Sequence, residues 1–134
     1  MWTYTLPLEC PPKEARKEDV KVFRLVETIP STGQDWVPLA LEQKMNPPKT
    51  PHQDFDAFKD CCAHGLSVFS DINDVKAKRK RFKKKFKNHK IVEGTISKND
   101  GVILETFSDS HITWWLQTNN PQSTFIEVKE NVNV

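Results

Sequence analysis

Glycine is scarce in this chain, since only four of its 134 residues are glycine, at positions 33, 65, 94 and 101. These four cannot assemble a phosphate-binding P-loop, a dinucleotide-binding G-x-G-x-x-G motif or the G-x-S-x-G turn of serine hydrolases. The four histidines include no H-E-x-x-H motif and no pair at metal-ligand spacing. We therefore expect no metal site and no cofactor, and the sequence leaves open whether the protein is an enzyme.

Long apolar runs and paired cysteines are also missing. No run approaches the roughly 18 residues of a membrane-spanning helix, and residues 1–6 lack the features of a secretory signal. The three cysteines include no C-x-x-C pair, because Cys61 and Cys62 are adjacent and Cys10 is distant. This odd number predicts free thiols in a reducing compartment, with Cys61 and Cys62 packing in a helix. We accordingly expect no membrane partner and a cytoplasmic location.

Acidic residues are absent from residues 76–90, the basic segment, in which ten of 15 residues are Lys or Arg. The remaining 119 residues carry ten basic and 18 acidic side chains, a net charge of −8, although the whole chain has a net charge of +2. Like charges on a helix repel one another unless an anionic partner or an apolar contact offsets the repulsion. A solvated face that binds nothing, an anion-binding surface and a nuclear-localisation signal all fit this segment.

If the basic segment binds nucleic acid, release of condensed counterions predicts a steep dependence of affinity on salt. The residues expected to contact phosphate are Lys78, Arg79, Lys80, Arg81, Lys83, Lys84 and Lys85.

The order of apolar patterns predicts one α+β domain. Hydrophobic residues make up 37% of the chain and aromatic residues 10%, which is enough to form a core. We expect a mostly antiparallel sheet with two or three helices over residues 20–129, an irregular arm at 1–19 and a frayed tail at 130–134. The expected strands are 20–26, 66–69, 91–96, 102–107, 112–116 and 125–128. The expected helices lie at 35–44, from Thr50 to Gly65, and from Asp71 into the basic segment.

Several local patterns refine this outline. Thr50 and Gln53 are placed to form a capping box at a helix start, and Ser70 can cap the next helix. The segment 98–101 (Lys-Asn-Asp-Gly) is typical of a hairpin turn, so strands 91–96 and 102–107 are expected to pair.

Apolar residues at helical spacing are expected to anchor the basic segment as core residues rather than to stack on nucleic-acid bases: Ile72, Val75, Phe82 and Phe86. Arg79 falls within this stripe, where a cation needs an ion pair or a side chain that extends to solvent.

The segment 109–115 combines several functional side chains. His111 and Thr113 form an H-x-T tripeptide and share one face of the expected strand, so both could contact one phosphate. Two-histidine phosphoesterases need a second such tripeptide, which the sequence lacks, and that enzyme class is excluded. Trp114 and Trp115 place one indole on each face, with at least one buried. The other is either available to a groove or, like the first, a core or edge residue.

Several short motifs together resemble a family of small uncharacterised bacterial proteins. In order along residues 20–128 they are Phe23-Arg24-Leu25-Val26, Pro30-Ser31-Thr32 with Asp35, Gly65-Leu66-Ser67-Val68-Phe69, Ile91-Val92-Glu93-Gly94 and His111-x-Thr113-x-Trp115. The family often has Pro at the position of Ser31, and its basic segment is shorter. The resemblance implies a bacterial origin and no established activity.

The same order of residues has a distant similarity to ADP-ribosyltransferases. In that superfamily an Arg or His on an early strand and a Ser or Tyr on a second strand hold NAD, and a Glu on a later strand often performs the chemistry. Arg24 and Ser67 match the first two positions. Glu105 and Glu127 are both candidates for the third.

These observations lead to one main functional hypothesis and two alternatives. The main one is a non-catalytic module that binds nucleic acid or a nucleotide-like ligand through the basic segment. The residues expected to line a separate, ligand-sized pocket are Arg24, Ser67, His111, Thr113 and Trp115. The alternatives are an ADP-ribosyltransferase-like enzyme using Arg24 and Ser67, and a subunit whose basic helix contacts an acidic protein.

Overall fold

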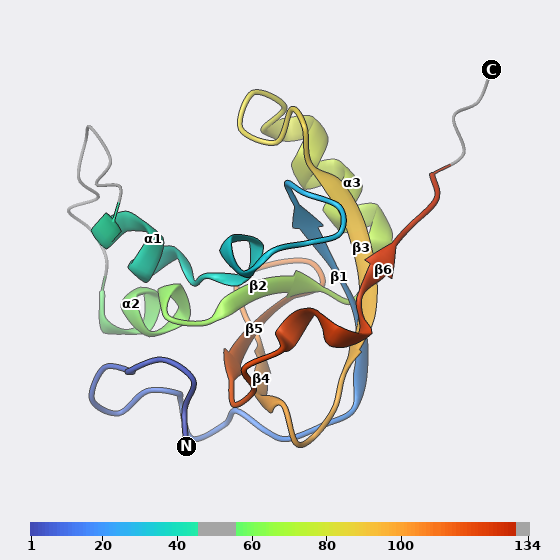
Figure 1. The fold of residues 1–134 in the computed structure, drawn as a ribbon. Coiled ribbons are helices and arrows are strands. Elements are labelled where there is room, and N and C mark those ends of the chain that lie inside the picture. The colour runs from blue at the N-terminus through green and yellow to red at the C-terminus, as the bar shows by residue number, and fades with distance from the viewer. Residues whose placement is uncertain (46–55, 131–134) are drawn as a thin grey trace.

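Six antiparallel strands form one sheet, which short helical segments cover in a computed structural model that describes residues 1–45 and 56–130 (Figure 1). The strands are β1 (Val20–Val26), β2 (Leu66–Phe69), β3 (Lys90–Ile96), β4 (Gly101–Glu105), β5 (His111–Leu116) and β6 (Ile126–Glu127). The helical segments are η1 (Gly33–Trp36), α1 (Leu39–Met45), α2 (Ala57–Ala63), α3 (Ile72–Arg81) and η2 (Pro121–Thr124). The predicted α+β class with a mostly antiparallel sheet is confirmed.

The predicted hairpin between β3 and β4 is wrong, because the strand order is β4-β5-β2-β1-β3-β6 and these two strands do not pair. The segment between them does turn, since Gly101 has a φ of +138° and the Asp100 carboxylate accepts a bond from Ser97 N at 2.9 Å. It crosses from β3 to the opposite edge of the sheet (Figure 1). A turn motif specifies a local change of direction, whereas burial of apolar side chains decides which strands pair.

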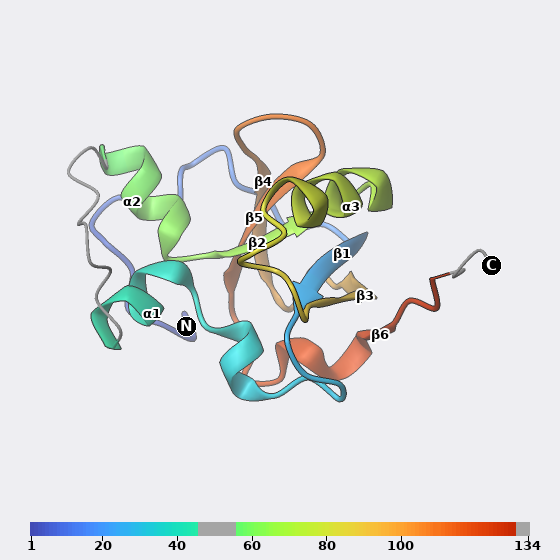
Figure 2. The same cartoon turned by 90° about the horizontal axis from the view of Figure 1, so that it is seen from above.

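One face of the twisted sheet (Figure 2), called the inner face from here on, carries the largest apolar cluster of the described residues. Because strand residues alternate between faces, the members of this cluster that share a strand lie an even number of residues apart, as Leu66 and Val68 do in β2. Its buried members are Val22, Val26, Trp36, Leu66, Val68, Val92, Ile96, Ile103, Ile112, Trp114 and Leu116. Ile96 of β3 and Ile103 of β4 both belong to it, so the two strands share a core although they are not neighbours in the sheet.

Helix α3 includes only part of the basic segment. Asp71 rather than Ser70 caps its start, accepting a bond from Asn73 N at 2.9 Å. Val75 is fully buried, as predicted, but the helix ends at Arg81 and the side chain of Phe82 is 47% exposed. The prediction that Phe82 anchors the helix is therefore wrong, because the consecutive cations that follow repel one another and do not extend the helix.

The segment before α2 contains two helical segments where one helix was expected at 35–44. η1 ends at Trp36 and α1 begins at Leu39, directly after Pro38, whose carbonyl accepts bonds from Leu41 N and Glu42 N. The capping box expected at Thr50 and Gln53 lies outside the described residues. Helix α2 instead begins after Asp56, which accepts a bond from Lys59 N at 2.8 Å.

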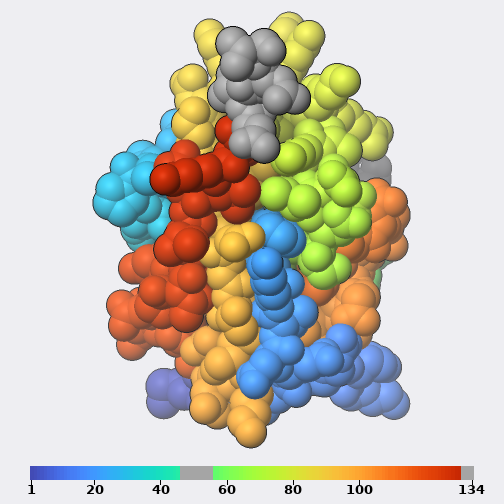
Figure 3. Space-filling model, turned by 90° about the vertical axis from the view of Figure 1, so that its right-hand side faces the viewer, coloured from blue at the N-terminus to red at the C-terminus, as the bar shows by residue number. Residues whose placement is uncertain are grey.

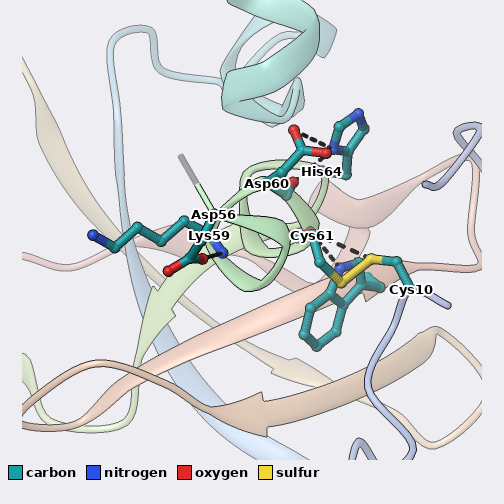
Figure 4. Close-up of a disulfide and its surroundings, with 7 residues drawn as sticks. Cys10, Asp56, Lys59, Asp60, Cys61 and His64 are labelled. Carbon is teal, nitrogen blue, oxygen red and sulfur yellow. Dashed lines mark hydrogen bonds and ion pairs between the residues drawn. A yellow bond between two sulfur atoms is a disulfide. The ribbon is translucent and has the colours of Figure 1, made fainter. Parts of the chain in front are cut away.

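The arm at residues 1–19 contains no helix and runs along the sheet edge (Figure 1). Thr3 N donates to the Leu116 carbonyl at 3.0 Å, and Arg16 forms an isolated bridge with Ile103 of β4. A disulfide joins Cys10 of this arm to Cys61 of α2 (Figure 4). The prediction of three free thiols is therefore wrong, because the packed arm brings two cysteines that are distant in sequence together.

The right-hand side of the molecule in Figure 1 faces the viewer in Figure 3. There β1 and β3 lie side by side, with residues 126–130 beside β3 and α3 beside β1. Strands β1 and β3 pair over seven residues, from Val20 opposite Ile96 to Val26 opposite Lys90. None of the helices in the described part of the chain is both long and apolar enough to cross a membrane.

The Cys10–Cys61 disulfide is expected to stabilise the fold, since it closes a loop with a sequence separation of 51. Loss of this constraint should lower the free energy of unfolding by about 2–4 kcal/mol. We expect Cys10→Ser to show this loss in urea denaturation, and Cys62→Ser to show little of it. Thiol titration of the unfolded, unreduced protein should find one free thiol, and a value of three would contradict the pairing.

Candidate functional site

Two apolar clusters occupy the outer face of the sheet and leave a polar strip between them. Beneath α3, the first cluster contains Phe23, Phe69, Val75 and Ile91. Beneath α2 and the arm, the second contains Cys61, Cys62, Val102 and Trp115. Since the two clusters are separate, the outward-facing residues of β2 and β5 that lie between them are available to form a site.

A chain of hydrogen bonds fills this strip. Ser67 Oγ lies 3.0 Å from His111 Nε2, and His111 Nδ1 lies 2.8 Å from Thr106 Oγ1. Thr106 Oγ1 in turn lies 2.8 Å from Thr113 Oγ1. Ser67 pairs with Thr113 across β2 and β5, which is why their side chains share a face. The turn after α2 also approaches closely, since a Cβ at Gly65 would lie 2.7 Å from Thr113 Cγ2.

His111 is neutral at physiological pH. Burial and the nearby ammonium of Lys78 lower the pKa of His111 to about 4. The phenyl ring of Phe69 contacts the imidazole at a centroid distance of 5.2 Å, with the rings nearly perpendicular. Each imidazole nitrogen therefore has a hydroxyl partner, one as donor and the other as acceptor.

Arg24 occupies an opening in the sheet. Strands β1 and β2 are in register only at Phe23 and Phe69 among the described residues. The guanidinium of Arg24 donates to the Ser67 carbonyl at 2.6 Å and, through two nitrogens, to the Asp35 carbonyl at 2.8 and 3.3 Å. It also lies over the indole of Trp36, at 5.3 Å from the ring centroid. Burial lowers the pKa of Arg24 to about 10, so the group remains charged.

The Asp35 carboxylate is committed to its own loop rather than to Arg24. It accepts bonds from Glu27 N at 2.8 Å, Thr28 Oγ1 at 2.5 Å and Thr32 N at 2.9 Å. Burial opposes ionisation, but these bonds dominate and lower the pKa of Asp35. They hold the chain between β1 and η1 in the position that presents the Asp35 carbonyl to Arg24.

A cavity of about 510 Å³ opens over these residues. Four cationic side chains line it, those of Arg24, Lys59, Lys78 and Lys85, together with the carboxylates of Glu27, Asp35 and Glu42. In the described part of the chain none of these four cations forms an ion pair. Burial, followed by repulsion from Lys85 and Arg24, lowers the pKa of Lys78. In the cavity four cationic side chains thus meet three carboxylates, and none of the four forms an ion pair within the described residues.

The structure brings together four of the five predicted pocket residues. Arg24, Ser67, His111 and Thr113 all line the cavity. Trp115 does not, because it is fully buried in the apolar cluster beneath α2, where its indole nitrogen donates to the Cys61 carbonyl at 2.9 Å. The two indoles do lie on opposite faces as predicted, but neither reaches a groove.

The predicted phosphate contacts divide between two surfaces. Lys78 and Lys85 line the cavity. A second hollow, the outer basic hollow, is lined by Lys76, Arg79, Lys80, Lys83, Lys84, Phe86, Lys87, His89 and Lys90. Arg81 lines neither. The Arg79 guanidinium bonds both oxygens of the Glu130 carboxylate, so Arg79 is engaged in the ion pair that its place in the apolar stripe required.

The glutamates expected from the ADP-ribosyltransferase similarity lie elsewhere. Glu105 forms an ion pair with Arg16 at 2.5 Å, and Glu127 lies in the short edge strand β6. Neither lines the cavity, whose carboxylates are those of Glu27, Asp35 and Glu42.

Thr106, Asp35 and Cys62 belong to the site but were not singled out as site residues in the sequence. Cys62 lines the cavity, and burial raises the pKa of its thiol. Thr106 stands beside His111 because β4 pairs with β5, so a correct strand pairing would have found it. Among the described residues, no group of His, Cys, Asp and Glu could hold a metal ion.

Comparison with known proteins adds no functional assignment. No protein-family model, curated protein or solved structure matches this chain significantly. The resemblance to small bacterial proteins therefore stays a prediction.

The low pKa of His111 makes the stability of the protein sensitive to acid. Between pH 6.5 and about 4 the unfolded chain binds a proton that the folded protein does not, so stability falls as the pH falls through this range. The full effect is about 3 kcal/mol. We expect His111→Gln to lose much of this dependence in urea denaturation at pH 7 and pH 4. His64→Gln is the control. An unchanged pH dependence in His111→Gln would contradict the lowered pKa of His111.

Proposed function

We propose that the protein binds a small phosphate-bearing ligand in the cavity formed by Arg24, Ser67, Lys78, Lys85 and His111. The observation that carries this proposal is that four cations, Lys59 among them, line the cavity and none of them contacts a carboxylate in the described residues. A phosphate supplies the missing negative charge and several acceptor oxygens. The proposal joins the pocket and the basic segment, which the sequence suggested separately, because Lys78 and Lys85 belong to both.

Hydrogen-bonding capacity in the cavity also suits a phosphate. The Arg24 guanidinium has five N–H groups, and three of its hydrogen bonds go to backbone carbonyls. Two N–H groups therefore remain for a ligand. The Ser67 hydroxyl adds a donor in the tautomer in which His111 Nε2–H donates to Ser67 Oγ. His89 also lines the cavity, and its buried Nδ1 has no hydrogen-bond partner in the described residues. The volume of about 510 Å³ falls in the usual range for small-molecule sites.

Lys78 offers the sharpest test of phosphate binding, because Arg24 also supports the fold. We expect pyrophosphate to bind at low salt in isothermal titration calorimetry, and Lys78→Gln to weaken binding roughly ten- to 100-fold by removing a charged hydrogen bond. Lys80→Gln is the matched control, since it removes the same charge from the same helix but lines the outer basic hollow. Absence of binding, or equal weakening by both variants, would refute the proposal.

A nucleic acid is a second candidate ligand, favoured by the outer basic hollow. Its exposed lysines can track a phosphate backbone, and each phosphate contact contributes a slope of about −0.9 to log affinity against log salt. Fluorescence anisotropy with a labelled DNA duplex should show this steep slope and a loss of affinity in the double variant Lys83→Gln/Lys84→Gln. Lys78→Gln should change it less. If no duplex binds at low salt, an acidic protein becomes the better candidate for this surface.

Two further sequence predictions carry less support. Neither glutamate considered for an ADP-ribosyltransferase-like activity, Glu105 or Glu127, lines the cavity. A cytoplasmic location stays a prediction, and the Cys10–Cys61 disulfide is more typical of an oxidising compartment.

A further inference from the structure

Phe107 is an exposed aromatic residue held in an unusual backbone conformation at the cavity. It lies in the short connection between β4 and β5, lines the cavity and is 61% exposed. Its φ is +61°, a left-handed conformation that is uncommon for a bulky residue. Such a conformation persists only where the surrounding structure imposes it, and it often marks a functional position.

The surrounding hydrogen bonds do impose this conformation. Thr106 N donates to the His111 carbonyl at 3.0 Å, and His111 N donates to the Ser108 carbonyl at 3.3 Å. The Thr106 side chain is buried in the hydrogen-bond chain with His111. With Thr106 directed into the protein and Ser108 tied to His111, the intervening residue must reverse the chain. Phe107 is therefore turned outward by the same bonds that build the site.

The exposed ring is positioned by contacts with other aromatic side chains. Its centroid lies 5.3 Å from that of His111, and 6.0 Å from that of Phe58 in an edge arrangement. Phe58 of α2 is itself 43% exposed. The contacts of His111 continue to Phe69, over which the Lys78 ammonium lies at 5.4 Å from the ring centroid. Ring contacts thus connect the exposed Phe107 through His111 and Phe69 to the Lys78 cation within one cavity.

We propose that Phe107 is a stacking platform for the base of a nucleotide whose phosphate is bound by Arg24 and Lys78. This inference rests on the proposed function and specifies its ligand class. An aromatic base can stack on an exposed phenyl ring regardless of its hydrogen-bonding pattern. The Glu27 and Glu42 carboxylates also line the cavity and can accept hydrogen bonds from ribose hydroxyls. A nucleotide uses the cations, the exposed ring and the carboxylates, whereas a simple aryl phosphate uses only the cations and the ring.

The experiment compares three phosphate esters by calorimetry: adenosine 5′-monophosphate, ribose 5-phosphate and phenyl phosphate. Stacking of one base is expected to strengthen binding roughly five- to 100-fold. The wild type should therefore bind the nucleotide at least about fivefold more tightly than ribose 5-phosphate, and phenyl phosphate less tightly than the nucleotide. Phe107→Asn should lower the affinity for the nucleotide to nearly that for ribose 5-phosphate, and should leave the affinity for ribose 5-phosphate unchanged. Asn tolerates a positive φ, so the fold should be retained.

Phe82→Asn is the matched control, because Phe82 is also exposed but does not line the cavity. Lys78→Gln should weaken nucleotide and ribose 5-phosphate alike. Equal affinity of the wild type for these two ligands would overturn the platform and leave the phosphate site standing, as would a preference that Phe107→Asn does not change. Tighter binding of phenyl phosphate than of the nucleotide would overturn the nucleotide class. Failure of all three ligands to bind would overturn the proposed function itself.

Discussion

The guanidinium of Arg24 sits where β1 and β2 separate, and the architecture around the cavity depends on it. The two strands meet in register only at Phe23 and Phe69, so the ladder between them cannot satisfy the Ser67 carbonyl. Arg24 supplies that bond and also binds the Asp35 carbonyl, which ties β1, β2 and η1 together. Backbone carbonyls rather than a carboxylate receive these bonds, so the positive charge is retained within the cavity.

A buried cation without a contacting counter-ion is unfavourable for folding, and here Lys78 and Lys85 lie close enough to add repulsion. The nearby carboxylates of Asp35 and Glu42 favour the charged form of Arg24 without contacting it, and apolar side chains pack on both sides of the site. One cluster lies beneath α3, and another lies beneath α2 and the arm. The polar strip between them is fully hydrogen-bonded from Ser67 through His111 to Thr113. The protein thus tolerates a costly charge where two rigid clusters define the surrounding walls.

Periodicity in the sequence predicted the elements better than their partners. Alternation placed His111 and Thr113 on one face and separated Trp114 from Trp115, because side-chain direction in a strand is a local property. Strand pairing is not local, and the turn at residues 98–101 fits a hairpin as well as it fits the observed crossing. That misassignment concealed Thr106, which belongs to the site only because β4 pairs with β5.

The other differences also arise from contacts between distant segments. The disulfide depends on how the arm packs over the sheet, and no spacing of cysteines encodes that packing. Trp115 was expected near a groove, but α2 and the arm cover it. By contrast, the need of Arg79 for an ion-pair partner could be predicted, because a charged side chain lies there within an apolar stripe. Glu130, at the end of the described chain, is that partner.

The disulfide also divides the site into two topological parts. Residues 10–61 form a covalently closed ring, which contains Arg24, Asp35 and Glu42. Ser67, Lys78 and His111 belong to the open chain that follows it. The cavity thus lies between the closed ring and the open chain that follows it. A single backbone cleavage inside the ring leaves both fragments joined by the disulfide. Reduction of the disulfide would convert this closed topology into a linear chain, in which noncovalent contacts such as the pairing of β1 with β3 would hold the two parts of the cavity together.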